Sequence, residues 1–253
     1  MRRGHSSEPM WSSWYQPSSL FLHGHLLGWP LDYDRLYRNL KRWEGIVGHM
    51  YLDSHKPPLV TVGAGNMLAS VGAAQALPFI NAETGHRATK NEIAHAFQKV
   101  TAMSGAHPSS HYRLRPSIEL PEGKIRELAL GRLRTEFIPG IKKLFRRFDD
   151  FPAPAREAII DIAYNAGIGK AENHAHGRPH KATGLHGFHW LRIAIEGGDW
   201  MAAARSSHRS SSRPERNRWT RDLFEHAAYL AAMQGRSEQQ WHLLGGQLNP
   251  PFP

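Results

Sequence analysis

The sequence predicts an α+β protein that is mostly helical, with one small β element near its front. Along most of the chain, apolar residues recur at spacings of three and four, which is typical of amphipathic helices. Between residues 50 and 68 the pattern changes to short β-rich pieces around Pro57-Pro58 and Gly63, which predicts a small hairpin or sheet. Because the helical and β segments are segregated along the chain, the α+β class is favoured.

The first helix is expected to begin after Asp32 or Asp34, because either side chain can cap the N-terminus of a helix. Glu44 falls toward the C-terminal end of this helix, and Gly48 is expected to terminate it. One apolar face of the helix is expected to pack into the core. That face comprises Leu36, Leu40, Trp43 and Val47.

Further helices are predicted along the rest of the chain. The same periodicity places them at about 70–80, 89–103, 122–148, 154–166, 187–196, 199–206 and 217–233. Pro139-Gly140 is expected to kink or split the segment 122–148, and Gly167 is expected to cap the helix 154–166. Loops are predicted at 104–121 and at 170–187, the second of which is rich in His and Gly.

The composition is basic and contains no cysteine. Lysine and arginine number 32 against 22 aspartate and glutamate, a formal net charge of +10. Such a field attracts polyanions, among them nucleic acid, anionic membranes and the bacterial wall. The absence of cysteine excludes disulfides and cysteine-ligated metals.

Hydropathy predicts neither membrane insertion nor a secretory signal. No apolar run approaches the roughly 18 residues of a membrane-spanning helix. The basic start Met1-Arg2-Arg3 is not followed by the apolar run of a signal peptide, because Leu20-Phe21-Leu22 is interrupted by His23 and Gly24. We therefore expect that another route carries the protein to any target outside the cytoplasm.

Two carboxyl groups and a hydroxyl are candidates for the cleavage of a glycosidic bond. That reaction needs a protonated carboxylic acid for the leaving oxygen and an anionic carboxylate that activates water or stabilises positive charge. Glu44 lies on a helix whose apolar face enters the core, so partial burial is expected to favour its protonated form. Asp53 lies nine positions on, and Thr61, eight further, can hydrogen-bond a water or a carboxylate. The alternative for Glu44 is a solvated surface charge.

A resemblance to a known family indicates the same residues. The resemblance is carried by Trp43-Glu44-Gly45, Met50-Tyr51-Leu52-Asp53-Ser54 and Thr61-Val62-Gly63-Ala64-Gly65. These segments resemble the opening of phage-type lysozymes and endolysins, glycoside hydrolase family 24, and imply that Glu44, Asp53 and Thr61 are catalytic. The chain departs from the family where Asn66 replaces a common His, and where His55-Lys56-Pro57-Pro58 lengthens the connection between Asp53 and Thr61.

The resemblance extends over residues 32–232. Phe148 through Gly167 looks like the family's central helix with its Ala-Tyr-Asn-x-Gly ending. Asp199-Trp200, Arg216-Asn217 and Leu223-Phe224 look like the closing helices. A lysozyme-like two-lobed fold is implied, with a small β lobe and a helical lobe around a central helix. Residues 1–31 would form an N-terminal extension, 32–235 the catalytic domain and 236–253 a C-terminal tail.

Three further residues are candidates for substrate binding: Tyr51, Tyr164 and Asn165. The last two end the predicted central helix, where they could line a cleft. The alternative is that Tyr164 belongs to the core and that Asn165 caps the helix.

The resemblance implies a muramidase, which hydrolyses the β-1,4 bond between N-acetylmuramic acid and N-acetylglucosamine in peptidoglycan with inversion. No cofactor and no metal are expected. The core also looks like the lysozyme domains of type VI secretion effectors. We therefore expect an antibacterial effector or an endolysin, delivered by a secretion system or a holin to the periplasm or wall of the target cell. The expected partners of this monomer are peptidoglycan and an immunity protein or a secretion-machinery component.

Two alternative functions stay open. A lytic transglycosylase would use the same fold and Glu44, with the muramic 6-hydroxyl in place of water. A non-catalytic module that binds the cell wall or nucleic acid could keep the same scaffold, because fold does not imply function.

Two clusters outside the carboxyl pair have competing interpretations. A metal could be held by His174, His176, His180, His186 and His189; without a supporting carboxylate, a solvated loop that reaches the substrate is favoured. The other cluster is basic and comprises Arg205, Arg209, Arg213, Arg216, Arg218 and Arg221. Its few aromatic neighbours favour a solvated face or attraction to a wall polyanion, and no nucleic-acid partner is expected.

Overall fold

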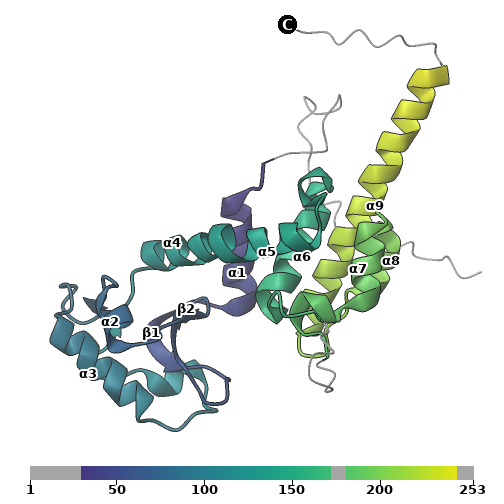
Figure 1. The fold of residues 1–253 in the computed structure, drawn as a ribbon. Helices are drawn as coiled ribbons and strands as arrows, with labels where there is room; N and C mark the ends of the chain where they lie inside the picture. The colour runs from purple at the N-terminus through teal and green to yellow at the C-terminus, as the bar shows by residue number, and fades with distance from the viewer. Residues whose placement is uncertain (1–29, 172–180, 244–253) are drawn as a thin grey trace, which may run out of the picture. The chain divides into compact units, whose positions relative to one another are not determined.

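The computed structural model describes residues 30–171 and 181–243, and over these residues the protein is α+β and mostly helical (Figure 1). The predicted fold class is therefore confirmed. The chain divides into two compact units, one of residues 31–140 and one that begins at Ile141. The boundary between the two units thus falls inside the segment 32–235, which was expected to form one catalytic domain.

The unit 31–140 contains the sheet and the helices around it. Its elements are α1 (Tyr33–Glu44), β1 (Val47–Leu52), β2 (Val60–Gly63), β3 (Asn66–Met67), α2 (Val71–Gln75), β4 (Ile80–Asn81), α3 (Lys90–Thr101), β5 (Ile118–Glu119) and α4 (Glu122–Arg132). Strands β1, β2 and β3 pair antiparallel in that order, and β4 pairs antiparallel with β5. The sheet predicted at 50–68 is therefore confirmed.

Helix α1 begins as predicted and ends earlier than predicted. The Asp32 carboxylate accepts a hydrogen bond from the amide of Arg35 at 2.9 Å, which confirms it as the N-terminal cap. The helix ends at Glu44 because Gly45 adopts a φ of 74°, a left-handed conformation that glycine reaches without steric cost. The expected terminator, Gly48, instead lies in β1, as does Val47, which was expected on the helical face.

The core of this unit lies beneath the sheet, between β1, β2 and the following helices. Met50 and Leu52 from β1 and Val60 and Val62 from β2 are buried in it. It is completed by Leu68, Ala74, Phe79, Ala88, Ile93, Ala96, Val100, Tyr112, Ile118, Leu120 and Ile125. This packing fixes the pairing register of the sheet, because a one-residue shift would move Met50 and Leu52 of β1 out of the core.

The helix predicted at 70–80 is much shorter than expected. Helix α2 covers only Val71–Gln75, and Ile80–Asn81 form β4 instead. Proline 78 explains the difference, because it lacks a backbone donor and disfavours helical backbone in the residue before it. The partner of β4 is β5, which lies inside the segment 104–121 that was predicted as a loop.

The helix predicted at 122–148 is split, although one turn before the predicted point. Helix α4 passes into a π-helical turn, Leu133–Phe137, and then into α5 (Ile138–Leu144). The amide of Ile138 bonds the carbonyl of Leu133, five residues back. Pro139 offers no amide to the preceding turn, so the strain is relieved by widening that turn while the helix continues through Gly140.

In the second unit, other helices pack around α6 (Ala153–Ala166). Every residue of α6 from Pro154 to Ala163 is buried, and Gly167 caps the helix with a φ of 78°, as predicted. Helix α9 (Pro214–Leu243) lies against both α6 and α8 (Trp200–Ser206), and α8 also packs against α7 (His189–Glu196) (Figure 1). Helix α9 therefore begins before 217 and continues past the domain boundary expected at 235.

A buried ionic network joins α6 to α9. The carboxylate of Asp161 accepts hydrogen bonds from Arg216 at 2.7 Å and from Arg209 at 2.8 Å, and the exposed fractions of these side chains are 1–4%. Arg209 also donates to the Thr220 hydroxyl at 2.6 Å. The predicted solvated face of arginines is therefore wrong for Arg209 and Arg216, whereas the other four arginines of that stretch are exposed.

Among the described helices, none is long and apolar enough to cross a membrane.

Replacing Asp161 should strongly destabilise the second unit. We expect Asp161→Asn to lower the free energy of unfolding by about 3–5 kcal/mol, because two buried guanidinium groups lose their counter-charge. The matched control is Asp150→Asn, which removes an exposed pair with Arg147 and should cost less than about 1 kcal/mol. Urea denaturation of the full chain measures both changes, and equal losses in the two variants would contradict the structural role of the network.

Candidate active site

Strand pairing places Tyr51, Asp53 and Thr61 on one face of the sheet. Tyr51 lies directly opposite Thr61 in the β1–β2 ladder, so the two side chains point the same way. The amide of Asp53 bonds the carbonyl of Leu59 at 3.0 Å, which continues the pairing beyond the strand. Since alternate residues of a strand share a face, Asp53 projects with Tyr51, opposite to the buried Met50 and Leu52.

Both oxygens of the Asp53 carboxylate accept hydrogen bonds. Oδ1 accepts from the amides of Leu59, at 2.9 Å, and His55, at 3.0 Å. Oδ2 accepts from Nδ1 of His55 at 2.8 Å and from the Thr61 hydroxyl at 3.3 Å. The sequence predicted that Asp53 and Thr61 act together. In the structure, a hydrogen bond joins their side chains.

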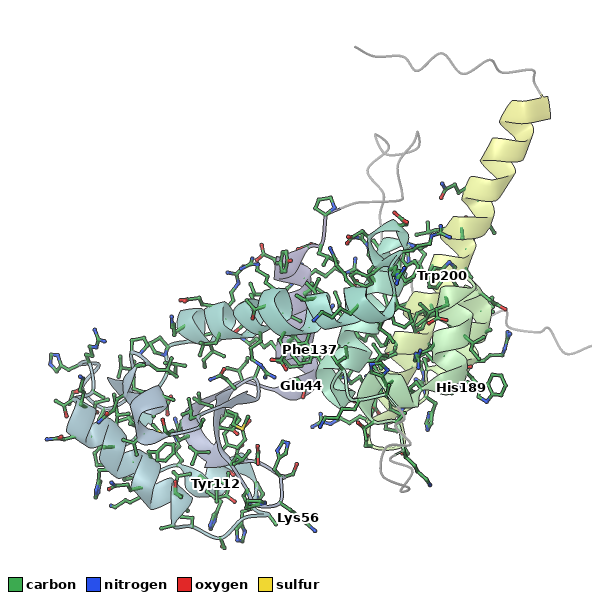
Figure 2. The ribbon with its side chains drawn as sticks, in the orientation of Figure 1. Glu44, Lys56, Tyr112, Phe137, His189 and Trp200 are labelled. Atoms are coloured by element: carbon green, nitrogen blue, oxygen red, sulfur yellow. The ribbon has the colours of Figure 1, made fainter. Side chains whose placement is uncertain are left out.

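The longer connection between Asp53 and Thr61 does not separate them, because the loop folds back on Asp53 itself. The Asp53 side chain binds the amide two residues ahead, as in an Asx turn, and also the amide of Leu59 where β2 approaches. Lys56 lies at the outer end of this loop (Figure 2). The insertion is thus a turn organised by the candidate catalytic carboxylate.

Hydrogen bonding keeps Asp53 ionised. Partial burial acts to raise the pKa of this carboxyl, but the amides of Leu59 and His55 and the His55 side chain outweigh it, so the pKa lies below its usual value. Asp53 therefore meets the electrostatic requirement for the anionic partner of a glycosidase pair.

The charges of both candidate carboxyl groups act on the phenol of Tyr51. Its pKa is raised to about 12, first by burial and then by the negative charges of Asp53 and Glu44. A backbone hydrogen bond with Gly65 acts in the opposite direction. Tyr51 is therefore a neutral phenol, and it lies on the same sheet face as Thr61.

Glu44 is the last residue of α1, at the point where the chain enters the sheet (Figure 2). The β1–β2 register shifts between Val47 and Tyr51: Val47 faces Gly63 and Tyr51 faces Thr61, so four steps on β1 oppose two on β2. Such a bulge bends its strand. The Glu44 side chain is exposed.

The expectation of partial burial for Glu44 is therefore wrong. Trp43 is half-buried, and the next residue of a helix points about 100° away from it. What holds Glu44 in place is α1, whose Leu36, Tyr37 and Leu40 are buried.

The turn between β2 and β3 packs against two residues of α4. Gly63 adopts a φ of 70°, and a β-carbon there would lie 2.8 Å from the Ile125 side chain of α4. Arg132, also on α4, donates to the carbonyl of Gly65 at 2.8 Å. The contact with Ile125 explains the first glycine of the Gly-x-Gly pattern, Gly63, since a side chain there would collide with α4.

Tyr164 and Asn165 lie on α6, in the second unit, and both are half-buried. Asn165 accepts a hydrogen bond from Arg209 at 3.5 Å, and Gly167, not Asn165, caps the helix. The contact with Arg209 connects Asn165 to the buried Asp161 network. Of the predicted site residues, the unit 31–140 therefore holds Glu44, Tyr51, Asp53 and Thr61.

His55 is the residue of this site that the sequence interpretation missed. It was counted among the residues that lengthen the loop, yet it contacts the Asp53 carboxylate with both its amide and its ring. The available signal was its spacing, because a residue two positions after Asp in a turn brings its amide to the carboxylate.

The predicted histidine cluster is only partly described. His174, His176 and His180 lie outside the described residues, whereas His186 and His189 lie within them. In the described part of the chain, no group of three or more His, Asp or Glu side chains could hold a metal ion.

Comparison with known proteins leaves the function to be argued from this geometry. No protein-family model matches the chain, and no curated protein matches it either.

Acid should remove the stabilisation that Asp53 provides. Because the folded-state pKa of Asp53 is lowered, its contribution is complete above the unfolded value of about 3.9 and is lost as the pH falls through the folded value. We expect Asp53→Asn to lower the free energy of unfolding at pH 7 and the gap to wild type to shrink below about pH 4. Denaturant unfolding of both proteins from pH 7 to pH 3 measures this, and a constant gap would contradict the hydrogen-bond pattern.

Proposed function

We propose that this protein is a peptidoglycan muramidase, which hydrolyses the β-1,4 bond between N-acetylmuramic acid and N-acetylglucosamine. The observation that carries the proposal is the pairing of an ionised, hydrogen-bonded Asp53 with the Thr61 hydroxyl. A second carboxyl group, Glu44, ends the helix that precedes β1 in the same unit. Two carboxyl groups in different environments are the requirement for glycoside hydrolysis.

The hydrogen bonding that favours the anionic form of Asp53 supports its role as the base and leaves the role of the acid to Glu44. Glu44, which is exposed at the helix end, donates a proton to the leaving glycosidic oxygen as the bond from C1 to that oxygen breaks. A bound glycan chain would cover this carboxyl and exclude water from it, which favours the neutral form that carries the proton.

Asp53 and Thr61 act on the attacking water. The Thr61 hydroxyl, whose side chain is buried, directs its one proton to the Asp53 carboxylate or the carbonyl of Leu59, and in this proposal its oxygen accepts from a water that enters beside Asp53. Asp53 takes the proton of that water as its oxygen bonds to C1. Attack from the face opposite the leaving group gives inversion; inverting glycosidases hold their two carboxyl groups roughly 6.5–9.5 Å apart to leave room for the water.

The charge of the chain suits this substrate. The formal net charge of +10 attracts the anionic bacterial wall over long range and raises the rate of encounter. We further propose an antibacterial effector or endolysin that acts at the wall of the target cell, with an immunity protein as the partner expected for an effector.

Hydrolysis is favoured over lytic transglycosylation. A transglycosylase uses the muramic 6-hydroxyl as the nucleophile and has no need of a second carboxylate to activate water. The ionised Asp53, in contact with Thr61, supplies the base that only the hydrolytic route requires.

Loss of either carboxyl group should abolish cleavage. We expect Glu44→Gln and Asp53→Asn each to reduce the release of fragments from purified peptidoglycan by about 10²–10⁴-fold, the usual contribution of a general acid or base. The matched control is Glu83→Gln, which changes an exposed carboxyl of the same unit and should act like wild type. Turbidity loss measures the rate, and mass spectrometry of the soluble products identifies reducing muramic ends.

The outcomes separate the candidate functions. Near-normal activity of Glu44→Gln would remove Glu44 as the acid, and anhydro-muramic products would identify a transglycosylase. Absence of any release by the wild-type protein would contradict the enzymatic proposal and favour a binding module on the same scaffold.

A further inference from the structure

We propose that His55 is a positioning residue for Asp53, and that its imidazole orients the carboxylate toward Thr61 and the attacking water. The inference rests on the proposed muramidase function and adds a residue to its machinery. It comes from the geometry of the loop between β1 and β2, in which one residue contacts both oxygens of the candidate base.

His55 controls the rotation of the Asp53 carboxylate because it binds the two oxygens through different atoms. Its amide donates to Oδ1 at 3.0 Å, and its Nδ1 donates to Oδ2 at 2.8 Å. An ionised carboxylate has no proton to donate, so the hydrogen between the ring and Oδ2 resides on Nδ1. A carboxylate held at both oxygens by one residue cannot rotate without breaking one of these bonds.

The imidazole carries most of the restraint on the oxygen that faces Thr61. Among the described residues, the other donor to Oδ2 is the Thr61 hydroxyl at 3.3 Å, and that hydroxyl also lies 3.2 Å from the carbonyl of Leu59. Oδ1, by contrast, keeps the amide of Leu59 at 2.9 Å if the ring is removed. Loss of the ring should therefore free Oδ2 selectively.

His55 can orient the Asp53 carboxylate without using Nδ1 to contact the substrate. Its side chain is 69% exposed, whereas that of Asp53 is 16% exposed, so the ring covers the carboxylate from the solvent side. The titratable groups of this unit that surround the pair are Tyr51 on β1, Glu44 at the end of α1 and Lys56, next in the loop. Tyr51 remains neutral over the working pH range, so it adds no charge beside the Asp53 carboxylate.

Two effects of the ring can be measured. As a restraint it acts on the reaction step, so its loss should lower kcat and leave KM nearly unchanged. As a donor to the charged form it favours ionisation, so its loss should raise the pKa of Asp53. The acidic limb of the pH profile of kcat/KM would then move to higher pH.

The decisive experiment compares the wild-type full chain with His55→Ala, His55→Asn and Ser54→Ala on soluble, uncrosslinked peptidoglycan from pH 4 to pH 8. We expect His55→Ala to lower kcat by about 10- to 100-fold, the range seen when a partner that orients a functional group is removed. His55→Asn should restore part of the activity, because its side-chain amide can donate from near the position of Nδ1. Ser54→Ala, a neutral change at an exposed position of the same loop, should match wild type.

Carbon-13 NMR titration of the Asp53 carboxyl, in wild type and in His55→Ala, provides a readout that needs no activity. A higher pKa in the variant supports the inference, and an unchanged pKa together with unchanged kcat in an active enzyme overturns it. Inactive wild-type protein would contradict the muramidase proposal, while the titration would still test the contact between His55 and Asp53. Equal losses in His55→Ala and His55→Asn would also overturn the inference, because they indicate a general packing role.

Discussion

The hydrogen bonding of the Asp53 carboxylate is the interaction on which the geometry of the candidate site depends. An ionised carboxylate only accepts, so it gathers donors, here the amides of His55 and Leu59, an imidazole and a hydroxyl. The same bonds close the loop between β1 and β2 and hold Thr61 beside the carboxylate. The structure of the loop and the chemistry of the site therefore rest on one side chain.

A second carboxylate, Asp161, shows how environment assigns a different task to the same chemical group. It is 4% exposed and lies against the guanidinium groups of Arg209 and Arg216, which joins α6 to α9. Water has little access to it, and a buried pair of this kind serves to specify packing. Asp53 is 16% exposed and accepts a hydrogen bond from the Thr61 hydroxyl, so water has more access to it than to Asp161.

Local signals predicted the elements in which one residue determines the backbone. Asp32 caps α1 and Gly167 ends α6 because a side-chain acceptor or a left-handed glycine acts within its own turn. The predictions were wrong where neighbouring residues compete. Both Gly45 and Gly48 could end the first helix, and Pro78 overrode the apolar pattern that indicated a helix to residue 80.

The sequence by itself determined the α+β class, the position of the sheet and the identity of the candidate carboxyl groups, because periodicity and spacing are local properties of the chain. Only the tertiary structure decided the surroundings of these groups. The exposure of Glu44, the contact of His55 with Asp53 and the burial of Arg209 and Arg216 depend on which distant segments pack against them. No pattern along the chain encodes those neighbours, since burial and hydrogen bonding between remote residues arise when the chain folds.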